Sequence, residues 1–486
     1  MPHCLRRYEW LPAWHVVCSR HVFMAMVSSS SSRSSRPRVV IVGAGFGGIR
    51  AARALADRPV DVLLIDRANH HLFRPLLYQV ATAGLGPESI AMPIRQLVAR
   101  RDDNVEVMLD EVCGGDPEAG VVFTSAGRRI PYDYLILGVG GMPNLFGNDH
   151  WRPHLFHLGN LRAAMSLKEN LLACYEAAAH EEDDARRQSL LTFVVIGGGP
   201  TGTELAGALA ELGRSVVPKD TRRIRPKDIR VVLVEANDRV LGTFHPELSH
   251  AAKGMLEDLG VEVHLGSPVT EVDARGVRLD DGARIESHTV CWASGVAPVP
   301  LGKAMGLPVD DDGAILVSAD LSVPGHPNVF ALGDGTRFVP PGEEAPLPGV
   351  APVAIQMGEH IGGAIKRDLD GDGRRDFHYL DKGMLATVGR SQAVLQMGAL
   401  RMSGTVAWLV WCVVHVWYLA GFRNRMKVLL DWTWNYVTFR PGARVLTFES
   451  GDRFGEPGAG VGVMSRPRPV SAPPVDPTPA PRRGAA

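Results

Sequence analysis

Near its start the chain reads Val39-Val40-Ile41-Val42-Gly43-Ala44-Gly45-Phe46-Gly47-Gly48, four aliphatic residues followed by a glycine-rich turn. A second stretch of the same design is Phe193-Val194-Val195-Ile196-Gly197-Gly198-Gly199-Pro200-Thr201-Gly202. A short apolar run bounded by glycine is typical of a strand buried in a parallel sheet. Two such loops, about one small domain apart, indicate a chain that binds two dinucleotides. The predicted fold class is therefore α/β, with two Rossmann-like domains.

Each glycine of such a loop has its own physical task. The first permits the tight turn from strand to helix, the second lets backbone N–H groups approach a pyrophosphate, and the third lets helix and strand pack closely. In the first loop these glycines are Gly43, Gly45 and Gly48, and in the second they are Gly197, Gly199 and Gly202.

An acidic residue follows the first loop at the expected distance. We predict a helix from about Phe46 through Leu55 and a strand over 60–65, which ends in Asp66. Asp66 lies 23 residues after Gly43, close to the ~20 expected for a carboxylate that binds ribose hydroxyls. An ordinary glycine turn, the alternative, would not need the strand, loop, helix and acid together.

The second loop is followed by a longer spacing. The strand 229–234 ends in Glu235, 38 residues after Gly197, and a basic insert around 214–230 accounts for the excess. A carboxylate in this position repels a 2′-phosphate, which favours NADH over NADPH.

A third buried strand, Asn328-Val329-Phe330-Ala331-Leu332, ends in Gly333-Asp334. Here the chain resembles the two-dinucleotide flavoproteins related to glutathione reductase. The resemblance implies that the first loop binds FAD, that Gly333 and Asp334 return to the ribitol of the flavin, and that the second loop belongs to an inserted NAD domain. The segments 134–141 and 290–296 resemble the crossover strands that leave and re-enter the flavin domain, although Gly138-Val139-Gly140 replaces the usual Ala-Thr-Gly.

Within that superfamily the chain resembles the type II NADH dehydrogenases, which are single-subunit, non-pumping NADH:quinone oxidoreductases. The resemblance is carried by 69–81, which includes Gln79, by 200–207, by 351–358, by 385–390 and by the tryptophan-rich stretch 408–436. It implies electron transfer from NADH through FAD to a membrane quinone.

The resemblance also implies site residues. Gln79 is expected to bind the flavin, Glu204 to act near the nicotinamide and flavin in proton or quinone handling, and Gln356 to contact the quinone head group. The alternatives are that Glu204 only stabilises a helix end and that Gln356 is a surface or capping residue. Many relatives have glutamine where Pro352 and Met357 stand here, which leaves the type of quinone open.

These observations predict a domain organisation. Residues 37–155 and 296–385 are expected to form a discontinuous FAD-binding domain, 156–295 the NADH-binding domain, and 386–448 a C-terminal module for membrane anchoring and dimer formation. Residues 1–36 are expected to be a disordered or wrongly included extension, and 449–486 a disordered proline-rich tail.

The C-terminal module contains a membrane signal. Residues 405–420 are nearly all apolar, three cations follow within 421–427, and five of the nine tryptophans fall between 408 and 434. Sixteen apolar residues are short of the ~20 that a spanning helix needs, so we predict that 405–436 is an anchor lying in one leaflet, on the cytoplasmic face of the cell membrane. The alternative is a buried interface of a homodimer, and the family suggests both.

Composition makes several other classes of protein function unlikely. A net charge of −1 and the lack of a basic stripe make nucleic-acid binding unlikely. The six cysteines form no close pair, which argues against a zinc site, a redox disulfide and sulfide as the donor. Asp368-Leu369-Asp370-Gly371-Asp372 has the initial spacing of a calcium loop but lacks its final glutamate, so we expect a turn and no metal. A flavoprotein with another donor, and a redox sensor resembling apoptosis-inducing-factor proteins, remain the alternatives.

Overall fold

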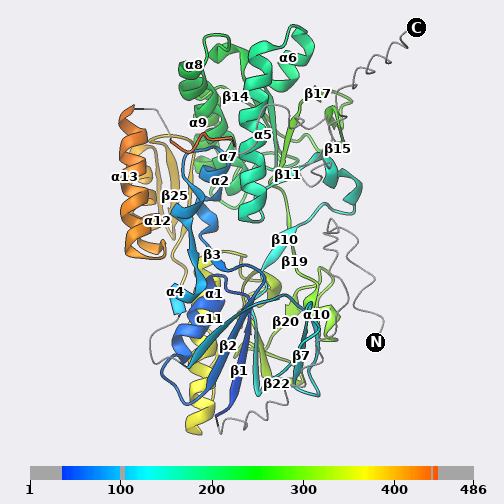
Figure 1. Cartoon of the computed structure of the whole chain (residues 1–486), viewed down its shortest axis with the longest axis vertical. Helices are drawn as coiled ribbons and strands as arrows, with labels where there is room; N and C mark the ends of the chain where they lie inside the picture. The colour runs from blue at the N-terminus through cyan, green and yellow to red at the C-terminus, as the bar shows by residue number, and fades with distance from the viewer. Residues whose placement is uncertain (1–35, 99–103, 439–441, 447–486) are drawn as a thin grey trace, which may run out of the picture.

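The computed structural model describes residues 36–98, 104–438 and 442–446. The segments predicted to be terminal extensions, 1–36 apart from Arg36 and 449–486, lie outside the described residues. Figure 1 shows two lobes, each built on a sheet, with helices α12 and α13 packed beside the upper lobe.

The lower lobe in Figure 1 is built on a six-stranded sheet. Its strands lie in the order β21 (Ser322–Val323), β22 (His326–Ala331), β9 (Tyr134–Leu137), β1 (Arg38–Val42), β2 (Asp61–Asp66) and β5 (Val105–Leu109). Neighbouring strands are parallel except for β21 and β22. Strands from two distant parts of the chain therefore form one sheet.

Strand β1 is buried on both faces because it lies inside the sheet. Val39 and Ile41 pack with α1 (Phe46–Leu55) and α11 (Ala351–Asp370), whereas Val40 and Val42 join the core on the other face. That second core also receives residues from a small antiparallel sheet of β6 (Val112–Asp116), β7 (Val121–Thr124) and β8 (Arg129–Pro131). The alternation follows from the two-residue period of a strand.

The upper lobe repeats this design with different residues. Its five strands are all parallel and lie in the order β11 (Phe156–His157), β18 (Thr289–Trp292), β12 (Thr192–Ile196), β13 (Arg230–Val234) and β14 (Val261–His264). One face carries the helices α5 (Leu161–His180), α7 (Pro200–Glu211) and α9 (Pro246–Asp258), and the other carries the antiparallel strands β15 (Val269–Asp273), β16 (Gly276–Leu279) and β17 (Arg284–Glu286). The predicted α/β fold class is confirmed.

Two short strands join the lobes. β10 (Gly141–Pro143) leaves the lower lobe and β19 (Val296–Pro298) returns to it, and the two pair antiparallel between the lobes (Figure 1). Other short elements of the two lobes include β3 (His70–Leu72), α2 (Leu77–Ala81), α3 (Pro87–Ile90), β4 (Ala91–Pro93), α4 (Ile94–Val98), α6 (Asp184–Leu190), α8 (Val217–Asp220), α10 (Leu301–Ala304), β20 (Ile315–Leu316) and β23 (Thr336–Arg337).

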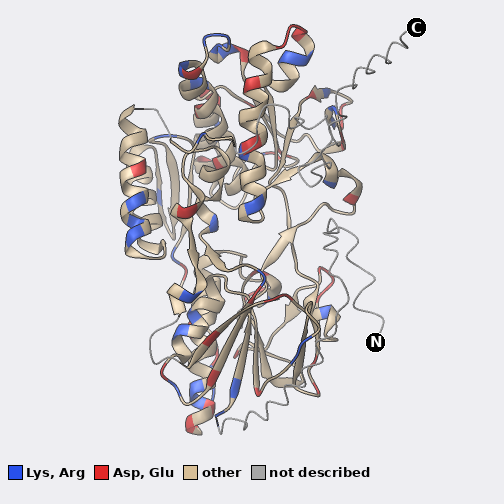
Figure 2. Ribbon diagram, in the orientation of Figure 1, with Lys and Arg blue, Asp and Glu red and all other residues tan. Residues whose placement is uncertain are grey.

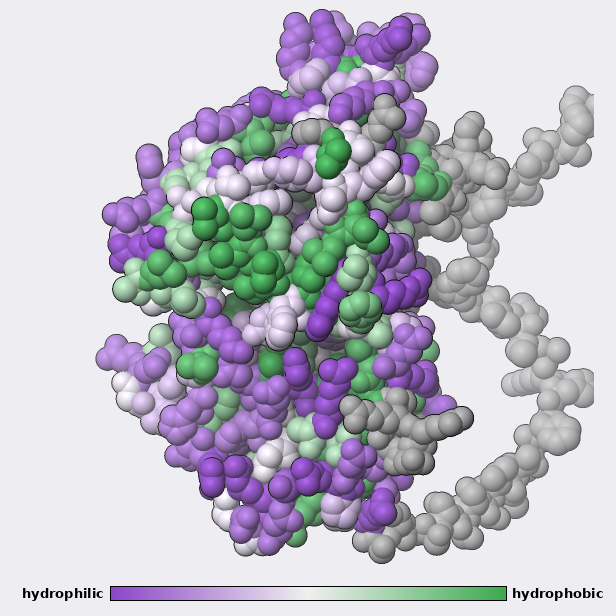
Figure 3. Space-filling model, turned by 90° about the vertical axis from the view of Figure 1, so that its left-hand side faces the viewer, coloured by the Kyte–Doolittle hydropathy of each residue, from purple (hydrophilic) through white to green (hydrophobic). Residues whose placement is uncertain are grey.

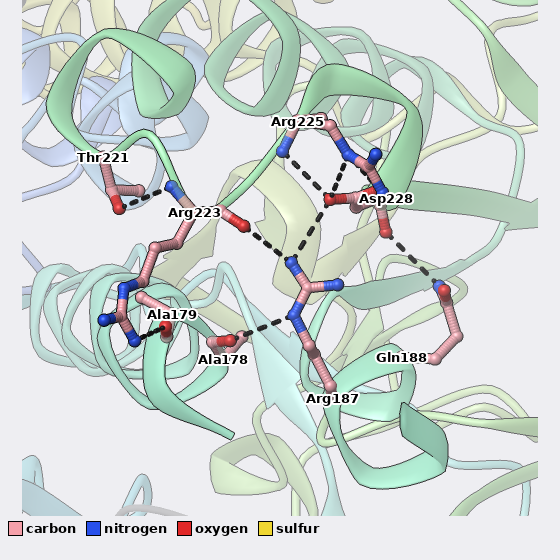
Figure 4. A network of polar contacts seen from close by, with 8 residues as sticks. All are labelled: Ala178, Ala179, Arg187, Gln188, Thr221, Arg223, Arg225 and Asp228. Carbon is pink, nitrogen blue, oxygen red and sulfur yellow. Dashed lines mark hydrogen bonds and ion pairs between the residues drawn. The ribbon is translucent and has the colours of Figure 1, made fainter. Parts of the chain in front are cut away.

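The basic insert between α7 and β13 is ordered by an ion-pair network (Figure 4). Arg187 on α6 donates from Nη2 to Asp228 at 3.2 Å and to the carbonyl of Arg223 at 2.9 Å. Arg225 also donates to Asp228, at 3.0 Å from its Nη2. Burial raises the pKa of Asp228, but the hydrogen bonds from Arg225 and Arg187 outweigh it and lower that pKa to about 2. The insert is therefore pinned against α5 and α6.

The C-terminal module begins with an antiparallel sheet of β24 (Met384–Thr387), β25 (Ala393–Met397) and β26 (Leu400–Ser403), followed by α12 (Thr405–Tyr418) and α13 (Phe422–Thr438). Among the described residues, no helix is both long enough and apolar enough to cross a bilayer. The two helices present an apolar surface, the green area of Figure 3, with Val413 68%, Phe422 78% and Val437 73% exposed.

The suspected calcium loop is the end of α11. Gly371 terminates the helix in the left-handed region at φ +77°, where glycine has no steric penalty. The Asp368 carboxylate is bound by Arg374, which also contacts Asp320.

Candidate functional site

The first glycine of each loop has a backbone that only glycine adopts without strain. Gly43 has φ +100° and Gly197 has φ +107°. A Cβ on Gly43 would stand 2.2 Å from the carbonyl oxygen of Gly138, and one on Gly197 would stand 2.9 Å from Ala293. The loop therefore passes directly over the end of the neighbouring crossover strand in both lobes.

The third glycine brings helix and strand together. A Cβ on Gly48 would stand 1.9 Å from the carbonyl oxygen of Gly43, and one on Gly202 would stand 1.8 Å from that of Gly197. Any side chain would push α1 or α7 off its strand, since these contacts are to backbone atoms.

The middle glycines leave room for a ligand. A Cβ on Gly45 or Gly199 would meet no described heavy atom within 4 Å. These two residues are the N-caps of α1 and α7, and neither helix start has a side-chain cap. Open space, uncapped N–H groups and the positive end of a helix dipole are the features that a pyrophosphate requires. Both loops fit a dinucleotide.

The two acidic residues occupy equivalent places. Asp66 accepts a hydrogen bond from the backbone N–H of Ala44 at 2.6 Å, and Glu235 accepts one from that of Gly198 at 2.5 Å. In each loop the donor is the residue between the first two glycines. Each carboxylate also binds the backbone N–H two residues further on, that of Ala68 or Asn237. The structure therefore brings each predicted acid to the rim of its predicted loop.

The Gly-Asp pair after β22 lies beside the first loop. Gly333 has φ +71° and donates to the sulfur of Met357 on α11 at 3.4 Å. A Cβ on Gly47 would stand 2.6 Å from the carbonyl oxygen of Ala354, so the first turns of α1 and α11 are in contact. The Asp334 carboxylate lies 3.8 Å from Arg74. The first loop, Asp334 and the start of α11 thus form one cluster.

The two glutamines make contacts that their positions in sequence did not reveal. Gln79 accepts a hydrogen bond from the indole N–H of Trp432 on α13 at 2.8 Å and donates to the hydroxyl of Tyr78 at 3.0 Å. Gln356 donates to the carbonyl of Leu380 and accepts from its N–H, both at 3.0 Å. The hydrogen bonds of Gln79 connect α2 to the C-terminal helices, and those of Gln356 connect α11 to the segment before β24. Their roles toward flavin and quinone stay predictions.

Glu204 lies in α7 beneath the C-terminal module. Its carboxylate accepts a hydrogen bond from the N–H of Thr387 at 3.3 Å. Burial raises the pKa of Glu204 to about 8, against smaller opposing contributions from Thr387 and Trp411. The indole Nε1 of Trp411 faces the carboxyl group but forms no hydrogen bond of normal geometry to any described atom. Glu204 therefore holds a proton at neutral pH.

A cavity of about 180 Å³ lies between α2, α7, the turn after β24 and the helices α12 and α13. Its aromatic wall consists of Trp408, Trp411, Trp432 and Tyr436, and its polar wall includes Tyr78, Gln79, Glu211 and Arg390. Sequence analysis missed Glu211 and Arg390. The available signal was the seven-residue spacing from Glu204 to Glu211, which places both on one face of α7.

A second cavity, of about 210 Å³, lies where α1 and α11 meet the connection between α12 and α13. It is lined by Phe46, His71, Ile355 and residues 417–421, among others. Burial lowers the pKa of His71, whose Nδ1 is 2.9 Å from the carbonyl oxygen of Ala44. Within the described part of the chain, no cluster of three His, Cys, Asp or Glu residues is arranged to hold a metal ion.

Comparison with known proteins identifies the class. Residues 37–358 match the family model described as pyridine nucleotide-disulphide oxidoreductase, and the chain belongs to that family. It is 41% identical over 433 residues to a type II NADH:quinone oxidoreductase, NdhA, of Mycobacterium tuberculosis, covering 86% of this chain and 91% of that protein. A second protein of that organism with the same description, Ndh, is 39% identical over 426 residues, covering 85% and 90%.

A solved structure has the same fold. The structure of NDH2 from Plasmodium falciparum in complex with NADH superposes with a TM-score of 0.78 at 19% identity and covers 84% of this chain and 99% of that one. Within the pyridine nucleotide-disulphide oxidoreductases, this chain is a member of the type II NADH:quinone oxidoreductases. The family resemblance predicted from sequence is confirmed.

Replacing Glu204 by glutamine is expected to stabilise the protein at alkaline pH. The folded-state pKa is about 8 and the ordinary value is 4.5, so the native state keeps a proton that the unfolded chain releases between these values. Stability conferred at low pH is therefore lost as pH rises from about 5 to 8, by up to ~1.4 kcal/mol per pH unit for this group. The Tm of Glu204→Gln should exceed that of the wild type increasingly over this range. The exposed control Glu257→Gln should show the same dependence of Tm on pH as the wild type. If the Tm of Glu204→Gln also followed the wild type at a constant difference, the raised pKa of Glu204 would be contradicted.

Proposed function

We propose that the protein transfers electrons from NADH to a membrane quinone through FAD, without proton pumping. The observation that carries the proposal is the duplicated loop, with Asp66 and Glu235 bound to equivalent backbone N–H groups in a chain of this family. FAD, when bound, supplies the two-electron chemistry between a hydride donor and a quinone.

The residues of the first lobe suit FAD. Gly43, Gly45 and Gly48 leave the uncapped start of α1 open to a pyrophosphate, and Asp66 is placed to accept ribose hydroxyls. Gly333 and Asp334 lie beside that loop, where the family resemblance puts the ribitol.

The second lobe suits NADH. Gly197, Gly199 and Gly202 repeat the geometry of the first loop, and Glu235 stands at its rim. An anionic side chain accepts hydrogen bonds from the ribose hydroxyls of NADH and repels the 2′-phosphate of NADPH, so it selects NADH over NADPH.

The quinone site that we propose is the cavity between α2, α7 and the C-terminal helices. Its tryptophan wall offers flat apolar surface to a quinone ring, and its opposite wall carries polar groups that can bind the ring oxygens. Gln79 connects this cavity to the segment 69–81, which the resemblance places at the flavin edge.

The helices α12 and α13 are proposed to lie on the cytoplasmic surface of the membrane. Their exposed apolar side chains form a continuous face (Figure 3), and Arg423, Arg425 and Lys427 lie at the start of α13 (Figure 2). Apolar area beside cations suits the boundary between acyl chains and anionic headgroups. A homodimer is proposed as well, from the family resemblance; a second copy on this face would compete with lipid.

Stopped-flow absorbance tests the reaction. The purified yellow protein should bleach within about a second of mixing with NADH, because the donor reduces the flavin. It should recover its colour on adding a soluble quinone, because the acceptor oxidises the flavin again. A protein that bleaches but stays colourless with excess quinone would rule out the proposed acceptor. A preparation that never binds FAD would rule out the proposal as a whole.

Glu235→Arg should shift the preference toward NADPH. The change removes an acceptor of the ribose hydroxyls and adds a cation for the 2′-phosphate, so we expect the ratio of kcat/KM for NADH over NADPH to fall by about 10- to 100-fold. Glu271→Arg, an exposed residue on β15 of the same lobe, is the charge-matched control. An unaltered ratio in Glu235→Arg would mean that the nicotinamide dinucleotide binds elsewhere.

Charges on the apolar face should release the protein from lipid. Leu430 and Val437 on α13 are exposed, and each glutamate there would have to be desolvated at the bilayer. The double variant Leu430→Glu, Val437→Glu should stay in solution in a vesicle flotation assay, whereas Leu109→Glu, which changes an exposed leucine on β5, should float like the wild type. Flotation of the double variant would place the anchor elsewhere.

A further inference from the structure

Glu211 is a half-buried acid that the proposed roles above leave without a task. It lies at the end of α7, two helical turns beyond Glu204, and its side chain lines the aromatic cavity. A Cβ on Gly389 would stand 3.4 Å from Glu211 Oε1, so the carboxyl group sits against the Gly389–Arg390 turn that follows β24. This acid therefore contacts both the cavity and the C-terminal module.

Arg390 is held in place at the same wall of the cavity. Its guanidinium lies 4.0 Å from the centre of the Tyr436 ring and donates to the carbonyl of Asn435 at 3.2 Å, both on α13. A cation beside a carboxyl group stabilises the anion that remains after proton loss. The charge of Arg390 favours the ionised form of Glu211, and Glu211 lines the cavity into which it can release a proton.

We propose that Glu211 donates a proton to the quinone as the quinone is reduced, with Arg390 as the positioning residue that stabilises the resulting carboxylate. This inference rests on the proposed function and on the cavity as the quinone site. NADH supplies two electrons and one proton as hydride, and reduction to quinol needs two electrons and two protons. The O–H bond of Glu211 breaks and an O–H bond forms on one quinone oxygen, while the proton that NADH supplied within the hydride goes to the other oxygen. A proton from the solvent then restores the carboxyl group of Glu211.

The other titratable groups of the cavity do not compete for this role. Burial and the nearby Glu204 raise the pKa of Tyr78, and burial raises the pKa of Cys412 on α12 to about 12, so both stay neutral. Arg390 keeps its charge, and Tyr436 on α13 is a phenol that packs on it. Burial raises the pKa of Glu211 to about 7, against the opposing hydrogen bond from the backbone N–H of Arg390 and the charge of its guanidinium. Burial raises the pKa of Glu204, on the same helix, to about 8, but Glu204 is not among the residues that line the cavity.

Infrared titration of the oxidised holoenzyme tests the protonation without turnover. The protonated-carboxyl absorption of the wild type should be lost in two components, that of Glu211 with a midpoint near pH 7 and that of Glu204 near pH 8, and only the component near pH 7 should be missing in Glu211→Gln. Arg390→Met should move the midpoint of the Glu211 component upward because the cation is gone, whereas Arg390→Lys, which keeps the charge, should leave it close to the wild-type value. A Glu211 that is ionised at every pH above 5 would overturn the proposal.

Stopped-flow kinetics test the proton transfer. After reduction with one equivalent of NADH, recolouring by a short-chain benzoquinone should be tenfold or more slower in Glu211→Gln at pH 6. The wild-type rate should fall as pH rises through 7, and that dependence should be absent in the variant. Bleaching by NADH should change little, and the exposed control Glu257→Gln should behave as the wild type in both steps.

The outcomes separate the two proposals. Wild-type enzyme that is not recoloured by quinone would defeat the proposed function itself. Wild-type enzyme that recolours, with Glu211→Gln at the same rate and with the same pH profile, would defeat only the role of Glu211. If Glu211→Gln does not fold, the recolouring rate of Arg390→Met provides the test. That rate should fall with pH around a higher midpoint than in the wild type, and an unchanged midpoint would overturn the proposal.

Discussion

The close approach of helix and strand at the third glycine of each loop is the constraint on which the rest of the molecule depends. Gly48 and Gly202 stand so near the carbonyl oxygens of Gly43 and Gly197 that no side chain fits. This contact fixes where α1 and α7 begin, so the uncapped helix ends point into open space beside the acids. The same contact in α7 sets the positions of Glu204 and Glu211 further along that helix, beneath the C-terminal sheet.

Much of this framework could be predicted from the sequence because its signals are local. The helix expected over Phe46–Leu55 has those bounds, and the strand expected over 60–65 is found at Asp61–Asp66. Asp66 and Glu235 were identifiable because a carboxylate after the second strand has one physical use in such a unit. The structure adds what they do within the protein, which is to hold the loop through its backbone N–H.

The cavity was not predictable in the same way, because its walls come from parts of the chain that are far apart. Gln79 and Trp432 are 353 residues apart and share a hydrogen bond. Arg390 is the last residue of the motif 385–390, which was recognised only as part of the C-terminal module, and nothing local marks this turn as the neighbour of Glu211. The contacts of Gln356 could not be predicted either: both ends of its amide bind the main chain of Leu380, which lies outside the motif, and its role toward the quinone stays a prediction.

The apolar face of α12 and α13 has a consequence for folding during synthesis of the protein. In water, such a surface favours association between molecules. Because α12 and α13 follow both sheets in the sequence, the two lobes can leave the ribosome and fold before this apolar face has been synthesised. The order of the chain thus shortens the interval in which a nascent molecule exposes this face to its neighbours.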